Sequence, residues 1–223
     1  MTKILFVRHG QAQFGHENYD KLSKIGLAQS VALGKELAKQ GVVVDQWIQG
    51  DMVRHDETLS GIVEGMGISV PSVVKTDDLN EYDFRALLDA RFVGRQRPDG
   101  LHTDRKTHFR LLRDTLALWQ DNKISNPPES WEEFETRLAR VSKRVADLEG
   151  DTILVVSSGG VISKIIASAL GLSNAKQVDV QLQIKNASVT TFIYSRRTET
   201  LFLNGFNETP FVEKDTQHFL TYS

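Results

Sequence analysis

Cysteine is absent from the 223-residue chain, which excludes disulfide bonds, thiolate metal ligands and a cysteine nucleophile. Long apolar runs are absent as well, since no stretch approaches the roughly 20 apolar residues that a membrane helix needs. The first residues, Met-Thr-Lys, lead directly into a strand pattern, without the apolar core and cleavage site of a signal peptide. From these absences we expect a cytoplasmic protein without a membrane partner.

An excess of charge of either sign is also missing. The 27 basic residues nearly balance the 29 acidic ones, and the net charge is -2. This balance gives no broad attraction to nucleic acid, so an anion site must come from a local cluster of Arg and His. The motif G-x-x-x-x-G-K-[ST] does not occur, and the glycine pair at 159–160 lacks G-x-G-x-x-G spacing. We therefore set aside P-loop and dinucleotide enzymes.

The chain does contain a short apolar run, Ile-Leu-Phe-Val at positions 4–7, that ends on Arg8, His9 and Gly10. Four consecutive apolar residues predict a strand buried on both faces. Ligands of open α/β sheets bind beyond the carboxyl ends of the strands, which is where Arg8 and His9 stand. Neutral imidazole can attack phosphorus, and a guanidinium can hold phosphoryl oxygens. Taken alone, however, these three residues do not exclude a strand end with polar residues before a turn.

Strand and helix patterns alternate along the chain. Ser23 can cap a helix that ends near Gly41, and the segment from Ser130 to Glu133 is a capping box that opens a helix through Leu148. Further helices are predicted before residue 67 and at 161–170, and further strands at 45–49, 73–74, 152–156, 189–194 and 200–206. This alternation predicts a three-layer α/β fold, with a mostly parallel central sheet covered by helices on both faces.

The segment 84–128 changes this rhythm, because apolar residues recur at helical spacing around a polar stretch that contains Pro98 and Gly100. We expect a single domain over residues 1–223 with a helical insertion at about 84–128. Substrate specificity is expected in the insertion, whose arginines could contact anionic groups or form a solvated basic face: Arg91, Arg95, Arg97 and Arg105. The sequence leaves the oligomeric state open, a homodimer included.

Several motifs, in their order along the chain, resemble those of the histidine phosphatase superfamily, whose fold is phosphoglycerate mutase-like. They are Leu-Phe-Val-Arg-His-Gly at 5–10, Leu-Ser-Lys-Ile-Gly-Leu-Ala-Gln at 22–29, Asp-Met-Val-Arg at 51–54, Leu-Asn-Glu at 79–81 and Ser-Ser-Gly-Gly at 157–160. The resemblance spans nearly the whole chain. It implies a metal-independent phosphomonoester hydrolase, without a cofactor, that acts on a phosphorylated small molecule.

The resemblance also implies roles at the matching positions. His9 would be the nucleophile that takes the phosphoryl group, and Arg8 and Arg54 would hold its oxygens. Glu81 would donate a proton to the leaving oxygen, and the same carboxyl group would then act as base when water hydrolyses the phosphohistidine. Three further residues would complete the phosphate cradle: Gln11, Ser158 and Gly159. No residue is expected to bind a metal.

One position departs from the superfamily's pattern, in which the turn after the fourth strand carries a second histidine within Ser-His-Gly-Gly. Ser158 occupies that position here; its hydroxyl is a hydrogen-bond donor that cannot carry positive charge. Loss of one oxyanion donor typically costs about 100- to 1000-fold in rate. His16 and His55 are candidates to compensate, although each of them, taken alone, is better interpreted as a surface polar residue. The remaining histidines have no metal-site spacing: His102, His108 and His218.

Three functions therefore remain open. The first is a phosphomonoester hydrolase that works through phosphorylated His9. The second, motivated by Ser158, is a phospholigand-binding or regulatory module that keeps the arginine pocket with weak turnover or none. The third is a phosphoglycerate-type mutase, which needs a closed site that keeps its phospho-donor from water. The sequence shows no such closure, so the mutase ranks below the hydrolase.

Overall fold

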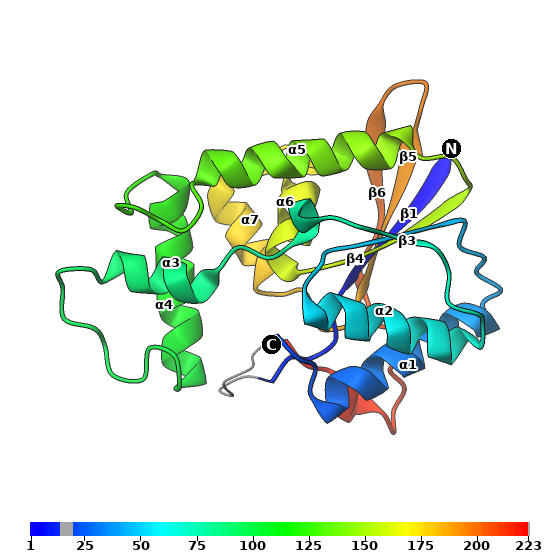
Figure 1. Cartoon of the computed structure of the whole chain (residues 1–223), viewed down its shortest axis with the longest axis horizontal. Helices are drawn as coiled ribbons and strands as arrows, with labels where there is room; N and C mark the ends of the chain where they lie inside the picture. Colours follow the sequence, from blue (N-terminus) through cyan, green and yellow to red (C-terminus); the bar gives the residue numbers. More distant parts are fainter. Residues whose placement is uncertain (14–19, 223) are drawn as a thin grey trace.

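The computed structural model describes residues 1–13 and 20–222, which form one six-stranded sheet with helices on both faces (Figure 1). The strand order is β3-β2-β4-β1-β5-β6. The strands β3, β2, β4 and β1 are parallel to one another, whereas β5 is antiparallel to β1 and to β6. The strands are β1 (Thr2–Arg8), β2 (Gln46–Gln49), β3 (Val73–Lys75), β4 (Thr152–Ser157), β5 (Val189–Ser195) and β6 (Thr200–Glu208).

Helices form a layer on each face of this sheet. On one face, α1 (Lys24–Lys39) and α2 (Val53–Met66) share a core with β1, β2 and β4. On the other face, the same strands pack against α5 (Trp131–Asp147) and α6 (Gly159–Leu170). The remaining helices are α3 (Phe84–Arg91), α4 (Arg105–Gln120), α7 (Asn174–Gln181) and the short turns η1 (Asp77–Leu79) and η2 (Gln217–Phe219). The predicted α/β class and the mostly parallel sheet are confirmed.

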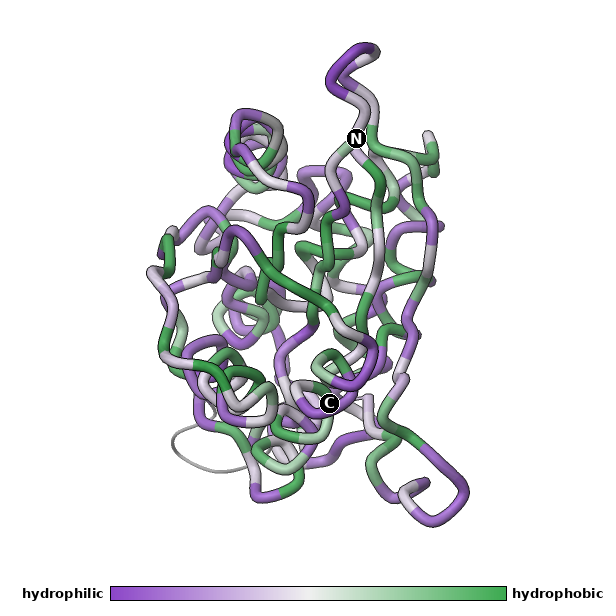
Figure 2. The backbone as a smooth tube through the Cα atoms, turned by 90° about the vertical axis from the view of Figure 1, so that its right-hand side faces the viewer, coloured by the Kyte–Doolittle hydropathy of each residue, from purple (hydrophilic) through white to green (hydrophobic). Residues whose placement is uncertain are grey.

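Strand β1 is buried on both faces, because each side chain from Ile4 to Val7 is at most 2% exposed. Ile4 and Phe6 belong to the core under α5 and α6, whereas Leu5 and Val7 belong to the core under α1 and α2. Figure 2 shows the central strands as largely hydrophobic tracts inside the molecule. Burial of one such side chain stabilises the fold by about 1.5–3 kcal/mol. The two cores together fix the end of β1, where the polar residues begin.

The predicted helix boundaries follow the local signals in the sequence. The Ser23 side chain accepts a hydrogen bond from the backbone of Gly26 and begins α1. Both halves of the capping box of Ser130 and Glu133 are formed at the start of α5. Gly67 ends α2 in the left-handed conformation, with φ of 66°, which glycine adopts without strain. Capping residues therefore determine where these helices begin and end.

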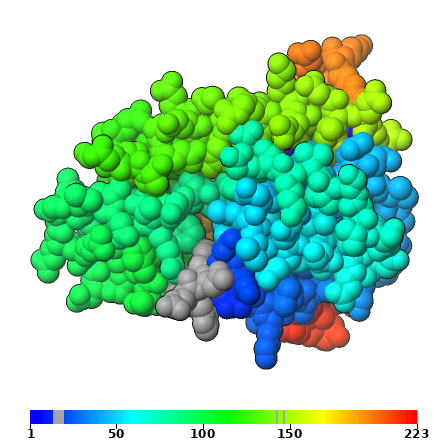
Figure 3. All heavy atoms as spheres, viewed as in Figure 1, coloured from blue at the N-terminus to red at the C-terminus, as the bar shows by residue number. Residues whose placement is uncertain are grey.

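The segment 84–128 contains α3 and α4 and lies at the end of the molecule away from α1 (Figures 1 and 3). Helix α7 was not predicted, because its eight residues bury only Gln177 and Val178 and so show little apolar periodicity. The two late strands form the antiparallel hairpin β5–β6. Across the described part of the chain, no helix combines the length and apolarity needed to cross a bilayer.

Candidate active site

His9 lies at the carboxyl end of β1 and is only 4% exposed. Its Nδ1 lies 2.7 Å from the carbonyl oxygen of Gly10, so Nδ1 carries the hydrogen and donates it. This tautomer leaves a lone pair on Nε2, and the ring borders a cavity. Burial, followed by the charges of Arg54 and Arg8 and by the neighbouring His55, holds the pKa of His9 well below 6.5, against the opposing hydrogen bond to Gly10. A neutral ring of this kind is a competent nucleophile.

Arg8, the last residue of β1, borders the same cavity. Its Nη1 donates to the backbone carbonyl of Ile184 and, at 3.0 Å, to that of Tyr222. Both carbonyls come from the part of the chain after α7. The C-terminal region therefore holds the guanidinium beside His9, where its planar set of donors suits phosphoryl oxygens.

Arg54, in the first turn of α2, is 3% exposed and also borders the cavity. Its Nη1 lies 2.7 Å from Oδ1 of Asp20. The other carboxylate oxygen of Asp20 accepts a hydrogen bond of 2.9 Å from the backbone of Val53. This contact supplies the acceptor that the N-cap residue Met52 lacks. One carboxylate thus begins α2 and holds the second arginine of the site.

Glu81 presents a carboxyl group to the cavity from the segment between η1 and α3. Its Oε2 accepts a hydrogen bond of 2.9 Å from the backbone of Gly160. Its Oε1 is buried and has no hydrogen-bond partner among the described residues. Burial raises the pKa of Glu81, while the Gly160 N–H and the guanidinium groups of Arg54 and Arg8 oppose the shift. A carboxyl group with a raised pKa keeps its proton to higher pH, as a general acid requires.

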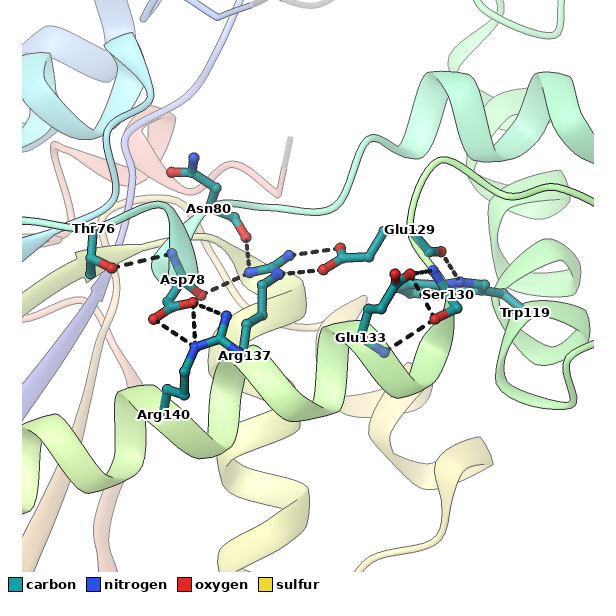
Figure 4. Close-up of polar contacts among 9 residues, drawn as sticks. All are labelled: Thr76, Asp78, Asn80, Trp119, Glu129, Ser130, Glu133, Arg137 and Arg140. Carbon is teal, nitrogen blue, oxygen red and sulfur yellow. Dashed lines mark hydrogen bonds and ion pairs between the residues drawn. The ribbon is translucent and has the colours of Figure 1, made fainter.

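Arg137 of α5 holds the backbone that leads into Glu81 (Figure 4). Its Nη1 donates to the carbonyl oxygens of Asp78 at 2.8 Å and Asn80 at 2.7 Å. Its Nε and Nη2 donate to the two carboxylate oxygens of Glu129 at 2.5 and 3.0 Å. Bidentate pairing of this kind fixes the plane of the guanidinium. Helix α5 therefore helps to determine the position of Glu81 without reaching the cavity itself.

The three residues predicted to complete the phosphate cradle differ in position. Gly159, at the start of α6, borders the cavity. Ser158 is fully buried, and its Oγ lies 2.8 Å from Nε2 of His55. The side-chain oxygen of Gln11 accepts a hydrogen bond of 2.8 Å from Ser23, and Gln11 is not among the described residues that border the cavity. Of the three, the structure brings only Gly159 to the cavity beside His9.

The cavity has a volume of about 300 Å³ and is lined by two chemically different sets of described residues. One set is the charged and ionisable groups described above. The other comes from α3, α4, α7 and their flanks and is mainly aromatic and aliphatic: Tyr82, Phe84, Phe109, Leu112 and Leu182. Arg105, His108 and Gln181 also border the cavity. Charged groups and apolar side chains thus border one cavity.

A family model of the histidine phosphatase superfamily (branch 1) matches residues 4–206. The chain belongs to this superfamily. Among curated superfamily relatives, a 2,3-bisphosphoglycerate-dependent phosphoglycerate mutase from Methylobacterium radiotolerans is 24% identical over 193 residues, which span 81% of this chain and 84% of the mutase. The resemblance stated from the motifs is confirmed.

Solved structures of both phosphatases and mutases share the fold. The alpha-ribazole phosphatase from Shigella flexneri matches with a TM-score of 0.66 and 19% identity, over 93% of this chain and 97% of that one. A mycobacterial glucosyl-3-phosphoglycerate phosphatase, in complex with inorganic phosphate, matches with a TM-score of 0.66 and 22% identity, over 96% and 100%. Phosphoglycerate mutase from Bacillus anthracis matches with a TM-score of 0.64 and 20% identity, over 94% of each chain. At sequence identities of 19–22%, these matches show a shared fold and do not by themselves indicate a shared activity.

Of the two histidines considered as compensation for Ser158 in this superfamily member, only His55 can be placed. It is fully buried on α2, with its ring centroid 5.8 Å from that of His9. His16 lies outside the described residues. His102 lies 3.0 Å from the carboxylate of Asp89 in the 84–128 segment. Within residues 1–13 and 20–222, no group of three or more His, Asp or Glu side chains is arranged to hold a metal ion.

Of the four arginines considered for specificity, Arg105 is the one found among the described cavity residues. Arg91 instead donates to the backbone of Leu111, and Arg97 pairs with Asp89 at 3.3 Å. Several cavity residues had no motif to identify them: Tyr82, Phe84, His108, Phe109, Gln181 and Tyr222. The helical spacing that includes Phe109 indicated a buried face of α4, and the same spacing is compatible with a face that borders a cavity.

Proposed function

We propose that this member of the histidine phosphatase superfamily is a metal-independent phosphomonoester hydrolase in which His9 carries the phosphoryl group. One observation supports this function above the others: His9, Arg8, Arg54 and Glu81 border a single cavity. Nδ1 of His9 is engaged with Gly10, which leaves Nε2 as the nitrogen with a lone pair. A nucleophile, two cationic clamps and an acid are the groups that phosphoryl transfer through a covalent intermediate requires.

In the first step, the lone pair of His9 Nε2 attacks phosphorus and the bond between phosphorus and the ester oxygen breaks. Arg8 and Arg54 stabilise the charge on the phosphoryl oxygens during this transfer. The proton of Glu81 passes to the leaving oxygen, so the product is a neutral alcohol. The directions of the two pKa shifts support this assignment, since the lowered pKa of His9 keeps the ring unprotonated and the raised pKa of Glu81 keeps its proton.

In the second step, a water molecule attacks the phosphorus of phosphorylated His9. The Glu81 carboxylate left by the first step accepts a proton from this water as the phosphorus–nitrogen bond breaks. Inorganic phosphate leaves, and both residues return to their starting protonation states.

The composition of the cavity favours an ester whose alcohol part is apolar. A phosphoglycerate carries a carboxylate in addition to its phosphate, and a mutase must bind both groups. Among the described residues, the rest of the cavity lining is mainly aromatic and aliphatic, with Arg105 as its one arginine or lysine beside the polar side chains of His108 and Gln181. An apolar wall gains free energy by burying apolar surface, about 25 cal/mol for each Å². We therefore place hydrolysis of an aryl or alkyl phosphate ahead of mutase chemistry.

The test compares wild type with His9→Ala in the presence of a chelator, using 4-nitrophenyl phosphate, an alkyl phosphate and 3-phosphoglycerate. We expect wild type to release inorganic phosphate from the first two substrates and His9→Ala to release none above background. Phosphate release that survives in His9→Ala would refute the assignment of the nucleophile. Isomerisation of 3-phosphoglycerate without free phosphate would identify a mutase, and tight phosphate binding without turnover would identify a binding module.

A further inference from the structure

A buried amide on α1 joins the segment after His9 to the C-terminal segment. Gln29, the last residue of the motif at 22–29, is 0% exposed. Its Oε1 accepts a hydrogen bond of 2.8 Å from the backbone N–H of Gln11. Its Nε2 donates to the carbonyl oxygen of Phe219 at 2.7 Å and to Oγ1 of Thr221 at 2.8 Å. Because a backbone N–H only donates and a carbonyl only accepts, these contacts determine which end of the amide is oxygen and which is nitrogen.

Two glycines let α1 come close enough for this contact. A Cβ built on Gly10 would lie 2.5 Å from the carbonyl oxygen of Gly26, and a Cβ built on Gly26 would lie closer still to that of Gln11. Both obstacles are backbone atoms, so a side chain at either position would push the helix and the loop apart. Gln29 lies three residues after Gly26 on α1 and therefore on the same face of the helix. The close approach of the two glycines thus brings its amide to the backbone of Gln11.

The N–H that Gln29 binds belongs to the same peptide unit as the carbonyl that binds His9. The Gly10 carbonyl accepts the hydrogen of His9 Nδ1 at 2.7 Å, and the N–H of Gln11 donates to Gln29. A peptide unit is planar, so its C=O and N–H turn together. Among the described residues, His9 and Gln29 are the hydrogen-bond partners of this unit, whereas the unit before it has other partners, Thr58 among them. The oxygen of Gln29 therefore determines which way the acceptor of His9 points.

The nitrogen of the same amide holds the segment that binds Arg8. Thr221 accepts a hydrogen bond from Gln29, and the carbonyl of the next residue, Tyr222, accepts one of 3.0 Å from Nη1 of Arg8. Arg8 also donates to a second backbone carbonyl, so Gln29 is not the sole support of this guanidinium. The effect of Gln29 on His9 should therefore exceed its effect on Arg8.

We propose that Gln29 is a positioning residue that fixes the tautomer and the orientation of His9 through the peptide unit between Gly10 and Gln11, an inference that rests on the proposed function. A neutral imidazole carries its hydrogen on either nitrogen, and the partner of one nitrogen decides which. With the Gly10 carbonyl held toward Nδ1, the lone pair stays on Nε2, the nitrogen proposed to attack phosphorus. Without the oxygen of Gln29, the peptide unit can rotate, and the hydrogen is shared between the two nitrogens.

The experiment records nitrogen NMR spectra of histidine-labelled protein at about pH 8, where histidine is neutral. The His9 signals are those that disappear in His9→Ala, and in wild type we expect hydrogen on Nδ1. Gln29→Met has a similar shape without the amide and should show both tautomers. It should also lose about 100-fold in kcat/KM, the cost of a small misplacement of a reacting group. This loss should be equal for 4-nitrophenyl phosphate and an alkyl phosphate, because attack by His9 is common to both.

Three further variants separate positioning from packing. Gln29→Glu keeps an oxygen for the N–H of Gln11 and should keep the wild-type tautomer, with kcat/KM within about tenfold of wild type. Thr221→Val acts on the C-terminal segment and should also keep the tautomer. Gln120→Met is the matched control, since it replaces another buried glutamine, on α4, whose amide binds Gln177 and which is not among the described cavity residues. It should change neither the tautomer nor kcat/KM.

A folded Gln29→Met protein that keeps the hydrogen on Nδ1 of His9 would overturn the inference, as would a mixture of tautomers in Gln29→Glu or in Thr221→Val. Melting curves identify any variant that does not fold. Gln29→Leu replaces Gln29→Met if the latter fails to fold, and the spectrum of Gln29→Glu decides if both fail. Failure of the proposed function is distinct, because it would appear as phosphate release by His9→Ala, whereas the tautomer is recorded without substrate.

Discussion

Replacement of Gly160 by alanine tests whether Glu81 donates the proton to the leaving group. A Cβ on Gly160 would lie 2.6 Å from Cε1 of Tyr82 and 3.0 Å from Cδ of Glu81, and closer still to Oε1 of Glu81. The carboxyl group must therefore move, and this movement breaks its hydrogen bond to the Gly160 N–H. General acid catalysis contributes about 100- to 10,000-fold, so we expect kcat for an alkyl phosphate to fall by about 100-fold or more.

The assay compares two substrates that differ in the acidity of their leaving group. 4-Nitrophenol is acidic enough to leave with little help from a proton donor, so the loss with 4-nitrophenyl phosphate should be about tenfold smaller than with the alkyl phosphate. Gly159→Ala is the matched variant, because its Cβ would lie 3.5 Å from Nε of Arg8, an ordinary contact. Gly159→Ala should therefore lower kcat less than Gly160→Ala does, with both substrates. Equal losses for the two substrates, or for the two glycine variants, would refute the reasoning.

Three other predictions follow from the same contacts. The value of kcat/KM should rise with pH through the lowered pKa of His9 and fall through the raised pKa of Glu81; Glu81→Gln should remove the falling limb. The unfolded chain protonates its histidines near pH 6.5, whereas folded His9 and His55 resist protonation. The free energy of unfolding should therefore decrease as pH falls below about 6.5, and denaturant titrations of His55→Gln should show a smaller decrease. Arg137→Ala removes the donor to the carbonyl oxygens of Asp78 and Asn80 and should destabilise the protein by about 1–3 kcal/mol. The same variant should lower kcat for the alkyl phosphate. An unchanged kcat would show that α5 does not position Glu81.

The fold was predictable because its main signals are local. The run at 4–7 is uniformly apolar because β1 is covered on both faces, and the caps at Ser23 and Ser130 act within one helical turn. Helix α7 lacks such a signal because it buries only two residues. Alternation and capping therefore predict the layers, whereas a helix with little buried surface is found only in the tertiary structure.

The composition of the candidate site could be predicted only in part, because some of its contacts join residues that lie far apart in the sequence. Arg8, His9, Arg54 and Glu81 follow recognisable motifs at strand ends, and all four border the cavity. The contact between His55 and Ser158 joins residues 103 positions apart, and no periodicity encodes it. Gln11 follows directly on the motif, yet its side-chain oxygen accepts a hydrogen bond from Ser23. The sequence indicated neither the contact between His55 and Ser158 nor that between Gln11 and Ser23. Both contacts depend on how α1, α2 and α6 pack around the end of β1.

Detection of the phosphorylated enzyme tests the role of His9 most directly. Wild-type protein is mixed with an excess of 4-nitrophenyl phosphate, quenched with alkali within the first turnovers and mapped by mass spectrometry, alongside His9→Ala. We predict one phosphoryl group for each chain, on His9 and labile to acid, formed at least as fast as kcat and absent from His9→Ala. An enzyme that turns over with no phosphate on His9, or with the phosphate on another residue, would contradict the proposed mechanism.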